Sequence, residues 1–338
     1  SKKRVPMTDS ATLAVRRIFP TWSGFALFKG LRRTPARCLS LALQGGGAQG
    51  AFTWGVLDAL LEDPSIAFDG LSGSGSGAMN AVVFADGWVK GGREGARQGL
   101  ADFWTEIGKH TPSERSPFNL NALRDLLNRQ IDFERVRRLS PFKLFVGTVQ
   151  ANTGKLRLFR ETELSAQVVL ASVCLPKIHL AVEIAGECYR AGSDLANPTV
   201  LPLLYDCDSQ DVLLVLLSPL QPTTTPRTAQ EVEARTMALA FGAHFLREMR
   251  MFAYAHAFAD PTVLTGSRLD QRLQNMRFHM IDTGQQASVH FSDTTPLAPT
   301  PYLEQLRAQG REQATHWLSA HVSGVGREST VDIQKYFT

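Results

Sequence analysis

Two consecutive strand, glycine-turn and helix units near the start of the chain constrain its fold most strongly. The first begins with CLSLALQ at residues 38–44, a short apolar run that continues through a glycine cluster into helical periodicity over residues 51–63. The second enters the glycines of residues 70–77 from another apolar run, and a helical pattern follows over residues 78–92. Strands that alternate with helices form parallel sheets with helices on their faces. The sequence therefore predicts an α/β protein.

The rest of the chain extends this pattern without repeats or a low-complexity linker. Further strands are predicted at residues 143–150, 155–160, 211–219 and 277–282, a hairpin at 179–193, and helices at 165–176, 228–258 and 300–322. No apolar run approaches the ~18 residues that span a bilayer. We expect a basic N-terminal arm over residues 1–37 and one domain over residues 38–338.

The arm differs from the rest of the chain in charge. It holds nine lysines and arginines against one acid, Asp9, whereas the remaining residues carry 27 basic and 31 acidic side chains. Aromatic residues such as Trp22 and Phe25 lie among these charges, a composition that suits an anionic membrane surface or an acidic protein partner. An arm that packs over its own domain is the alternative. We expect no nucleic acid partner, because no recognised binding motif accompanies the charge.

Neither the cysteines nor the glycines indicate a metal or a cofactor. Cys38, Cys174, Cys188 and Cys207 are scattered and lack the CxxC spacing of zinc sites, so a reducing compartment is expected. QGGGAQG at residues 44–50 is neither a P-loop nor a dinucleotide-binding motif. We expect a cytoplasmic protein without cofactor or metal, and membrane attachment through the arm would make it peripheral.

The first glycine turn has two readings. Successive backbone N–H groups at a helix start can point into one concavity and bind an anion or an oxyanion. Alternatively, the glycines meet a steric requirement of tight packing. The candidate oxyanion or anion-binding loop comprises Gly45, Gly46, Gly47, Ala48, Gln49 and Gly50.

The second turn lies in FDGLSGSGSGAMNAVV, residues 68–83, and resembles the elbow on which serine hydrolases carry their nucleophile. Three serines, Ser72, Ser74 and Ser76, alternate with glycines there. The GxSxG pattern is nevertheless absent when read strictly, because the residue between Gly73 and Gly77 at its centre is Gly75. A flexible glycine turn without chemistry is the alternative.

Together, these two turns resemble the patatin-like phospholipase family. CYRAGSDLANPTVLPLL at residues 188–204 resembles the family's third block, which carries Asp-Gly-Gly or Asp-Gly-Ala and then Asn-Pro, and SVCLP before it also fits. The resemblance covers nearly all of the chain after the arm. It implies a three-layer α/β/α sandwich with a mainly parallel central sheet, and lipid acyl-ester hydrolysis by a Ser–Asp dyad.

In this chain the resemblance leaves both dyad positions without reactive groups. The residues Gly77 to Ala81 place the nucleophile position at Gly75, and Asn197-Pro198 with Gly192 places the aspartate position at Ala191. The neighbours that could substitute for them are Ser74, Ser76 and Asp194. Adjacent side chains at a tight elbow point in different directions, and Asp194 lies at an odd offset from Ala191, so a substitute needs a rearranged backbone.

We therefore predict a catalytically inactive family member. Its expected ligand is a lipid, an acyl chain or an acyl-carrier-type group, or it acts as a regulatory or partner subunit. The alternative is an active lipid acyl hydrolase or acyltransferase that uses Ser74 or Ser76. A structural scaffold that binds through the arm is the third class.

Overall fold

The computed structural model describes residues 37–109, 120–174, 179–192, 195, 197–220, 225–258, 268–284 and 298–338. These residues belong to one unit, Pro35–Thr338. The predicted arm lies outside the described residues apart from Arg37, so its boundaries and partners stay predictions. Within the described part of the chain, no helix has the length and hydrophobicity needed to cross a membrane.

The described strands form one eight-stranded sheet in the order β5-β6-β3-β2-β1-β7-β8, with β4 on the other edge of β3. The strands β3, β2, β1, β7 and β8 run parallel, and β4, β5 and β6 pair antiparallel. The bounds are β1 Cys38–Leu43, β2 Ala67–Gly73, β3 Lys143–Gln150, β4 Leu156–Arg160, β5 Val182–Ile184, β6 Glu187–Ala191, β7 Asp211–Val215 and β8 Arg277–Ile281. The prediction of a mainly parallel sheet is confirmed.

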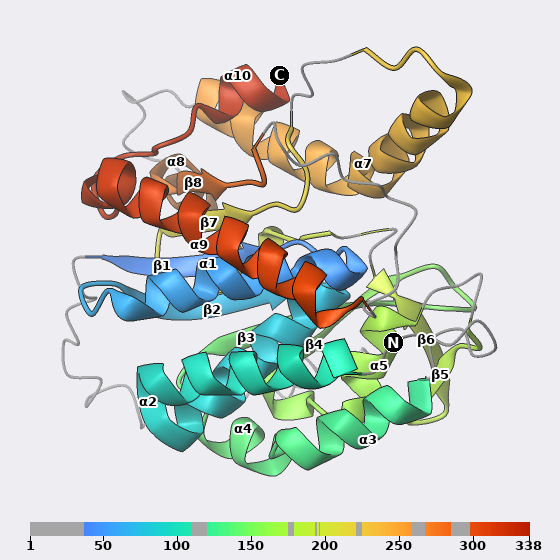
Figure 1. Cartoon of the computed structure of the whole chain (residues 1–338). Helices are drawn as coiled ribbons and strands as arrows, with labels where there is room; N and C mark the ends of the chain where they lie inside the picture. Colours follow the sequence, from blue (N-terminus) through green and yellow to red (C-terminus); the bar gives the residue numbers. More distant parts are fainter. Residues whose placement is uncertain are drawn as a thin grey trace, which may run out of the picture. The chain divides into compact units, whose positions relative to one another are not determined.

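Helices cover both faces of this sheet (Figure 1). Their bounds are α1 Gly50–Glu62, α2 Ser76–Lys109, α3 Leu120–Gln130, α4 Phe133–Leu139, α5 Ala166–Val173, α6 Leu201–Asp206, α7 Ala229–Ala257, α8 Arg268–Asn275, α9 Thr300–His321 and α10 Ile333–Phe337. The helix predicted over residues 78–92 breaks where expected, because Gly91 and Gly92 have non-helical backbone angles inside α2.

Alternating side chains of the central strands enter two separate hydrophobic cores. In β7, Leu213 and Val215 face the core formed with α1, α2 and α9, whereas Val212 and Leu214 face the core formed with α7 and α10. Period-two alternation in a strand whose two faces are both buried is what a sheet between two helical layers requires. The predicted three-layer α/β/α sandwich is therefore confirmed.

Helix α1 is buried on all sides, although its sequence predicted one apolar face. Its residues from Gly50 to Leu61 are all buried, because α9 lies along the side that faces away from the sheet (Figure 1). The two helices approach so closely that a Cβ on Gly55 would overlap the Arg307 carbonyl oxygen, and one on Gly310 would overlap the Phe52 carbonyl oxygen. Each glycine therefore supplies the space for the partner's backbone.

A buried carboxylate, that of Asp58, also stabilises the packing of α1 against α9. Asp58 accepts hydrogen bonds from Arg97 Nε at 2.7 Å, from Arg307 at 3.1 Å and from Arg311. Burial alone would raise the pKa of Asp58, but these three guanidinium donors outweigh it and lower the pKa. The charge is thus satisfied inside the helical layer, as a buried carboxylate must be.

Because α1 and α9 pack so closely, we expect alanine to destabilise the protein at a glycine of this crossing and to stabilise it at a glycine with open space around it. Gly310→Ala should lower the free energy of unfolding by about 1–3 kcal/mol, because its methyl group must displace the backbone of α1. Gly242→Ala in α7 is the matched control, since a Cβ there meets nothing within 4 Å. It should raise stability by roughly 0.5–1 kcal/mol through helix propensity. Urea unfolding of both variants measures this, and equal effects would contradict the packing argument.

Candidate functional site

The two glycine turns lie side by side where β1 and β2 end. Leu43 and Gly73, the last residues of these strands, are register partners in the parallel pair. A Cβ on Gly45 would overlap the Ser74 carbonyl oxygen, and a Cβ on Gly77 would overlap that of Leu43. Backbone therefore packs directly on backbone. Tight packing, the alternative reading of the first turn, is by itself sufficient to require glycine at these two positions.

Gly75 differs from the other glycines of the turns. Its φ of +57° is left-handed, and it lies between the end of β2 and the start of α2. The nearest group to a Cβ there would be the Gly45 Cα at 3.7 Å, an ordinary van der Waals distance. A strained strand-to-helix turn with room for one side chain is the geometry of a nucleophile elbow. The position that the sequence assigned to the nucleophile thus has the elbow's backbone, but it carries no side chain.

The two serines that flank Gly75 are buried. Ser76 is 1% exposed, and its Oγ accepts a hydrogen bond from the Gly46 N–H at 3.0 Å. Ser74 is fully buried and lies against β3, where a Cβ on Gly147 would overlap its Oγ. The flanking hydroxyls therefore point into the protein on different sides of the elbow. Ser72 is also fully buried, within β2.

Side chains already engage two amides of the candidate oxyanion loop. The Gly45 N–H donates to Asn197 Oδ1 at 2.6 Å, and Asn197 Nδ2 donates back to the Gly45 carbonyl at 2.9 Å. The Gly46 N–H is bound to Ser76. The loop then forms a short 3-10 turn, Gly47–Gln49, that leads into α1. An oxyanion role for the loop stays a prediction. Because the amides of Gly45 and Gly46 already have partners, only the amides after Gly46 would be left to bind an oxyanion.

A buried serine connects the elbow with the position predicted for the aspartate. Ser172 Oγ accepts from the Gly75 N–H at 3.0 Å and donates to the Gly147 carbonyl at 2.7 Å. Gly192 in turn packs on Gly147 so tightly that a Cβ would overlap the Gly147 backbone. Ala191 precedes it as the last residue of β6 and is 2% exposed.

The structure therefore brings the two predicted dyad positions to one corner of the sheet. Ser172 lies within the SVCLP motif, but sequence reasoning gave it no role. Asp194, the predicted substitute acid, lies outside the described residues. No group of three or more His, Cys, Asp or Glu residues in the described ranges is placed to hold a metal ion.

Sequence reasoning also missed Glu248, on the long helix α7. Its Oε1 accepts the Val200 N–H at 2.7 Å and the Leu201 N–H as well, and Thr199 also hydrogen-bonds to the carboxyl group. Burial raises the pKa of Glu248 from 4.5 to about 7. This carboxyl group therefore holds the start of α6, directly after the Asn197 that binds Gly45. In a helix pattern Glu248 looks like any surface acid, so no sequence signal identified it.

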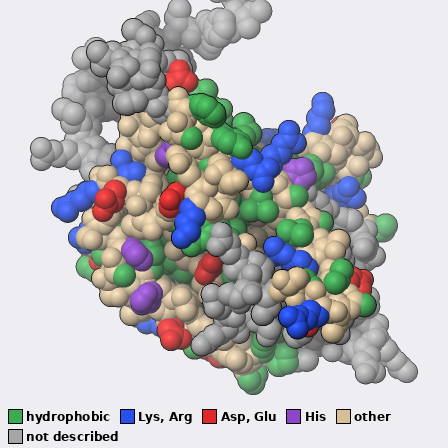
Figure 2. Space-filling model, turned by 90° about the horizontal axis from the view of Figure 1, so that it is seen from above, with side chains coloured by type: hydrophobic (Ala, Val, Ile, Leu, Met, Phe, Trp, Pro, Cys, Tyr) green, Lys and Arg blue, Asp and Glu red, His purple; other side chains and the backbone are tan. Residues whose placement is uncertain are grey.

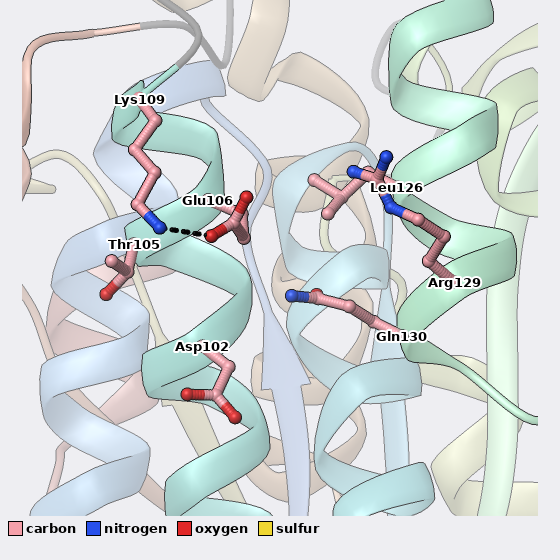
Figure 3. A pocket seen from close by; sticks show the side chains of 7 residues that line it. All are labelled: Asp102, Thr105, Glu106, Lys109, Leu126, Arg129 and Gln130. Carbon is pink, nitrogen blue, oxygen red and sulfur yellow. Dashed lines mark hydrogen bonds and ion pairs between the residues drawn. The ribbon is translucent and has the colours of Figure 1, made fainter.

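A cavity of about 590 Å³ lies away from the glycine turns, between the end of α2 and the end of α3 (Figure 3). Two acids and two bases line it, and Glu106 forms an ion pair with Lys109. The two acids and two bases leave the lining without net formal charge, so its charge selects a ligand of neither sign. The lining comprises Asp102, Thr105, Glu106, Lys109, Leu126, Arg129 and Gln130.

The buried Glu248 predicts a pH dependence of stability. Because folding raises its pKa, the folded protein binds this proton more tightly than the unfolded chain does. The contribution to the free energy of unfolding is therefore full below about pH 4.5 and is lost as the pH rises through about 7. Relative to Glu248→Gln, which keeps an acceptor but does not titrate, the wild type should lose on the order of 2–3 kcal/mol across that range. Urea unfolding at several pH values measures the difference, and parallel profiles would contradict the assignment.

Comparison with known proteins relates about half of this chain to a family. Residues 41–204 match the family model described as patatin-like phospholipase. VipD from Legionella pneumophila, a solved structure, matches with 17% sequence identity and a TM-score of 0.45, over 85% of this chain and 67% of that chain. No curated protein matches significantly. The matched residues 41–204 include both glycine turns, Ser172, Ala191 and Asn197. The resemblance to the patatin-like phospholipase family is thus confirmed over residues 41–204.

Proposed function

We propose that this protein is a catalytically inactive patatin-like protein, which binds a lipid, an acyl chain or an acyl-carrier-type group without hydrolysing it. In this role it acts alone or as a regulatory partner subunit. The observation that carries the proposal is Gly75, which has the left-handed backbone of the elbow, space for a side chain and no nucleophile. Loss of the nucleophilic serine in a serine protease costs on the order of a million-fold in turnover, which sets the scale of the deficit.

The surroundings of Gly75 support this proposal against the alternative of an active hydrolase or acyltransferase. A substitute nucleophile must reach a substrate carbonyl, and a base must be able to accept its proton. Ser76 is buried and binds the Gly46 N–H, while Ser74 is buried against Gly147. Ala191, at the position of the family's base, has only a methyl group. Either serine would need a different elbow backbone to attack an ester.

What is left of the site favours binding over turnover. The glycine turns still place backbone amides at the carboxyl ends of β1 and β2, the edge at which parallel sheets bind ligands. Ser172 and Asn197 hold these turns through four hydrogen bonds to backbone groups of Gly75, Gly147 and Gly45. A rigid scaffold of this kind is suited to presenting donors to a carbonyl or a carboxylate, although it cannot activate one.

Restoring the dyad tests the proposal. The wild type should hydrolyse a short p-nitrophenyl ester no faster than buffer, and Gly75→Ser with Ala191→Asp should gain measurable esterase activity. Gly75→Ala with Ala191→Asp is the matched control, because it adds the same Cβ at the same φ without a hydroxyl group. The proposal fails if the wild type turns over the ester and loses that activity in Ser74→Ala or Ser76→Ala.

Ligand binding can be tested separately by native mass spectrometry of the purified full chain. We expect a mass increment that matches an acyl chain or a lipid and disappears after extraction with organic solvent. Buffer-exchanged protein incubated with a long-chain fatty acid should regain an increment. A chain that carries no increment in either preparation would contradict the binding proposal, whatever the esterase result.

A further inference from the structure

Helix α7 presents apolar side chains both toward the protein and away from it. Its inner face, with Phe245, Met249, Phe252 and Ala253, is buried in the core shared with α10. A capping box of Thr228 and Glu231 fixes its first turn. A helix that packs one side on a core is expected to be polar on the other. The outer side of α7 departs from that expectation.

The outer side carries a run of exposed residues at helical spacing, which we call the outer stripe: Arg247, Arg250, Met251, Tyr254 and Phe258. Met251 is 60% exposed, Tyr254 is 48% exposed and Phe258, which caps the helix, is 83% exposed. The rings of Tyr254 and Phe258 lie 6.2 Å apart, centre to centre. Spacings of three and four residues place them on one side of the helix. Figure 2, which looks down on the molecule from above, shows hydrophobic side chains gathered beside lysine and arginine side chains.

The stripe is positively charged. Arg247 and Arg250 are both exposed, and Arg250 donates one N–H to the Phe337 carbonyl at 3.2 Å. Glu248, between them in the sequence, faces inward and binds the start of α6. From residue 247 to residue 258, the stripe therefore combines apolar side chains with two positive charges and carries no acid.

This charge argues against two occupants that the protein itself could supply, a second copy of the chain and the N-terminal arm. In a two-fold dimer through the stripe, the arginines of both copies would meet without an acid to pair with them. The N-terminal arm has nine basic residues and a single acid, so it would meet the same repulsion. A negatively charged surface with an apolar interior fits the stripe better.

We propose that the outer stripe of α7 docks on a lipid bilayer that contains anionic lipids. The helix lies in the plane of the interface, with Met251, Tyr254 and Phe258 at the boundary of the acyl chains and the arginines at the headgroups. The choice of a bilayer over an acidic protein rests on the proposed function, since an acyl or lipid ligand would be drawn from a membrane.

Flotation of the full chain with vesicles tests this docking. The wild type should float with vesicles of phosphatidylcholine and phosphatidylglycerol, and much less with phosphatidylcholine alone or at high salt. Tyr254→Ser with Phe258→Ser should weaken binding to the mixed vesicles about tenfold or more, because two apolar anchors are removed. Arg247→Glu should weaken binding to the mixed vesicles and leave binding to neutral vesicles unchanged.

The matched control is Leu139→Ser with Leu156→Ser, which removes two exposed leucines from α4 and β4. It should float like the wild type, and thermal melting should show that all variants are folded. Equal flotation of the control and the Tyr254/Phe258 variant would overturn the proposal, as would a wild type that does not float with mixed vesicles or floats equally with neutral ones. A wild-type dimer that the stripe variant converts to a monomer, measured by light scattering, would also overturn it.

Ligand retention separates this inference from the proposed function. The stripe variant should carry the same acyl increment in native mass spectrometry as the wild type, because the stripe does not contribute to the glycine turns. If the wild type floats through the stripe but carries no ligand, docking stands and the proposed ligand binding fails. If the wild type carries a ligand but does not float, the proposed ligand binding stands and the docking proposal fails.

Discussion

The direct contact between two backbone turns is the constraint on which the rest of this structure depends. Gly45 lies on the Ser74 carbonyl and Gly77 lies on the Leu43 carbonyl, with no space for a methyl group at either point. This contact sets the distance between the first turn and the elbow. It also fixes how α1 and α2 leave the sheet, since each helix begins within a few residues of its turn. Both helices enter the same layer, which also contains α9.

Side chains from distant parts of the chain stabilise the contact. Asn197 binds the N–H and the carbonyl of Gly45, and Ser172 binds the N–H of Gly75. Glu248 holds the start of α6, three residues after Asn197, and so connects α7 to the turns. A helix that carries a proposed membrane-docking stripe is thereby joined to the candidate site through one carboxyl group and one short segment.

Local sequence patterns were sufficient for the strands, the hairpins and the elbow. Short apolar runs predicted β1, β2 and β7, and the hairpin predicted at residues 179–193 corresponds to β5 and β6. Flanking residues placed the nucleophile position at Gly75, which has the left-handed φ of an elbow. These features depend on neighbours in the sequence.

Features that depend on contacts between residues far apart in the sequence could not be predicted from local patterns. Helix α1 is buried on every side because α9, some 250 residues later in the chain, covers it. The hydrophobic pattern of residues 51–63 does not indicate this second contact. The short helices α6, α8 and α10 have too few turns to show a period. Glu248 and Ser172 matter because of the backbone groups they reach, and their own sequence neighbourhoods do not specify those groups.

Under the proposed function, the energetics of the turn at Gly75 explain how a site without a nucleophile can persist. A non-glycine residue at a left-handed φ costs roughly 1–2 kcal/mol, a strain that an enzyme bears for the sake of its reactive group. Glycine at position 75 removes this cost, while the Ser172 hydrogen bond and the Gly45–Ser74 contact keep the turn in place. Asn197 and Ser76 accept hydrogen bonds from the N–H groups of Gly45 and Gly46, so these two amides are satisfied within the protein. Stability and activity compete at such positions. Under the proposed function, this chain has the more stable arrangement, and the elbow serves as a packing junction beside a binding site.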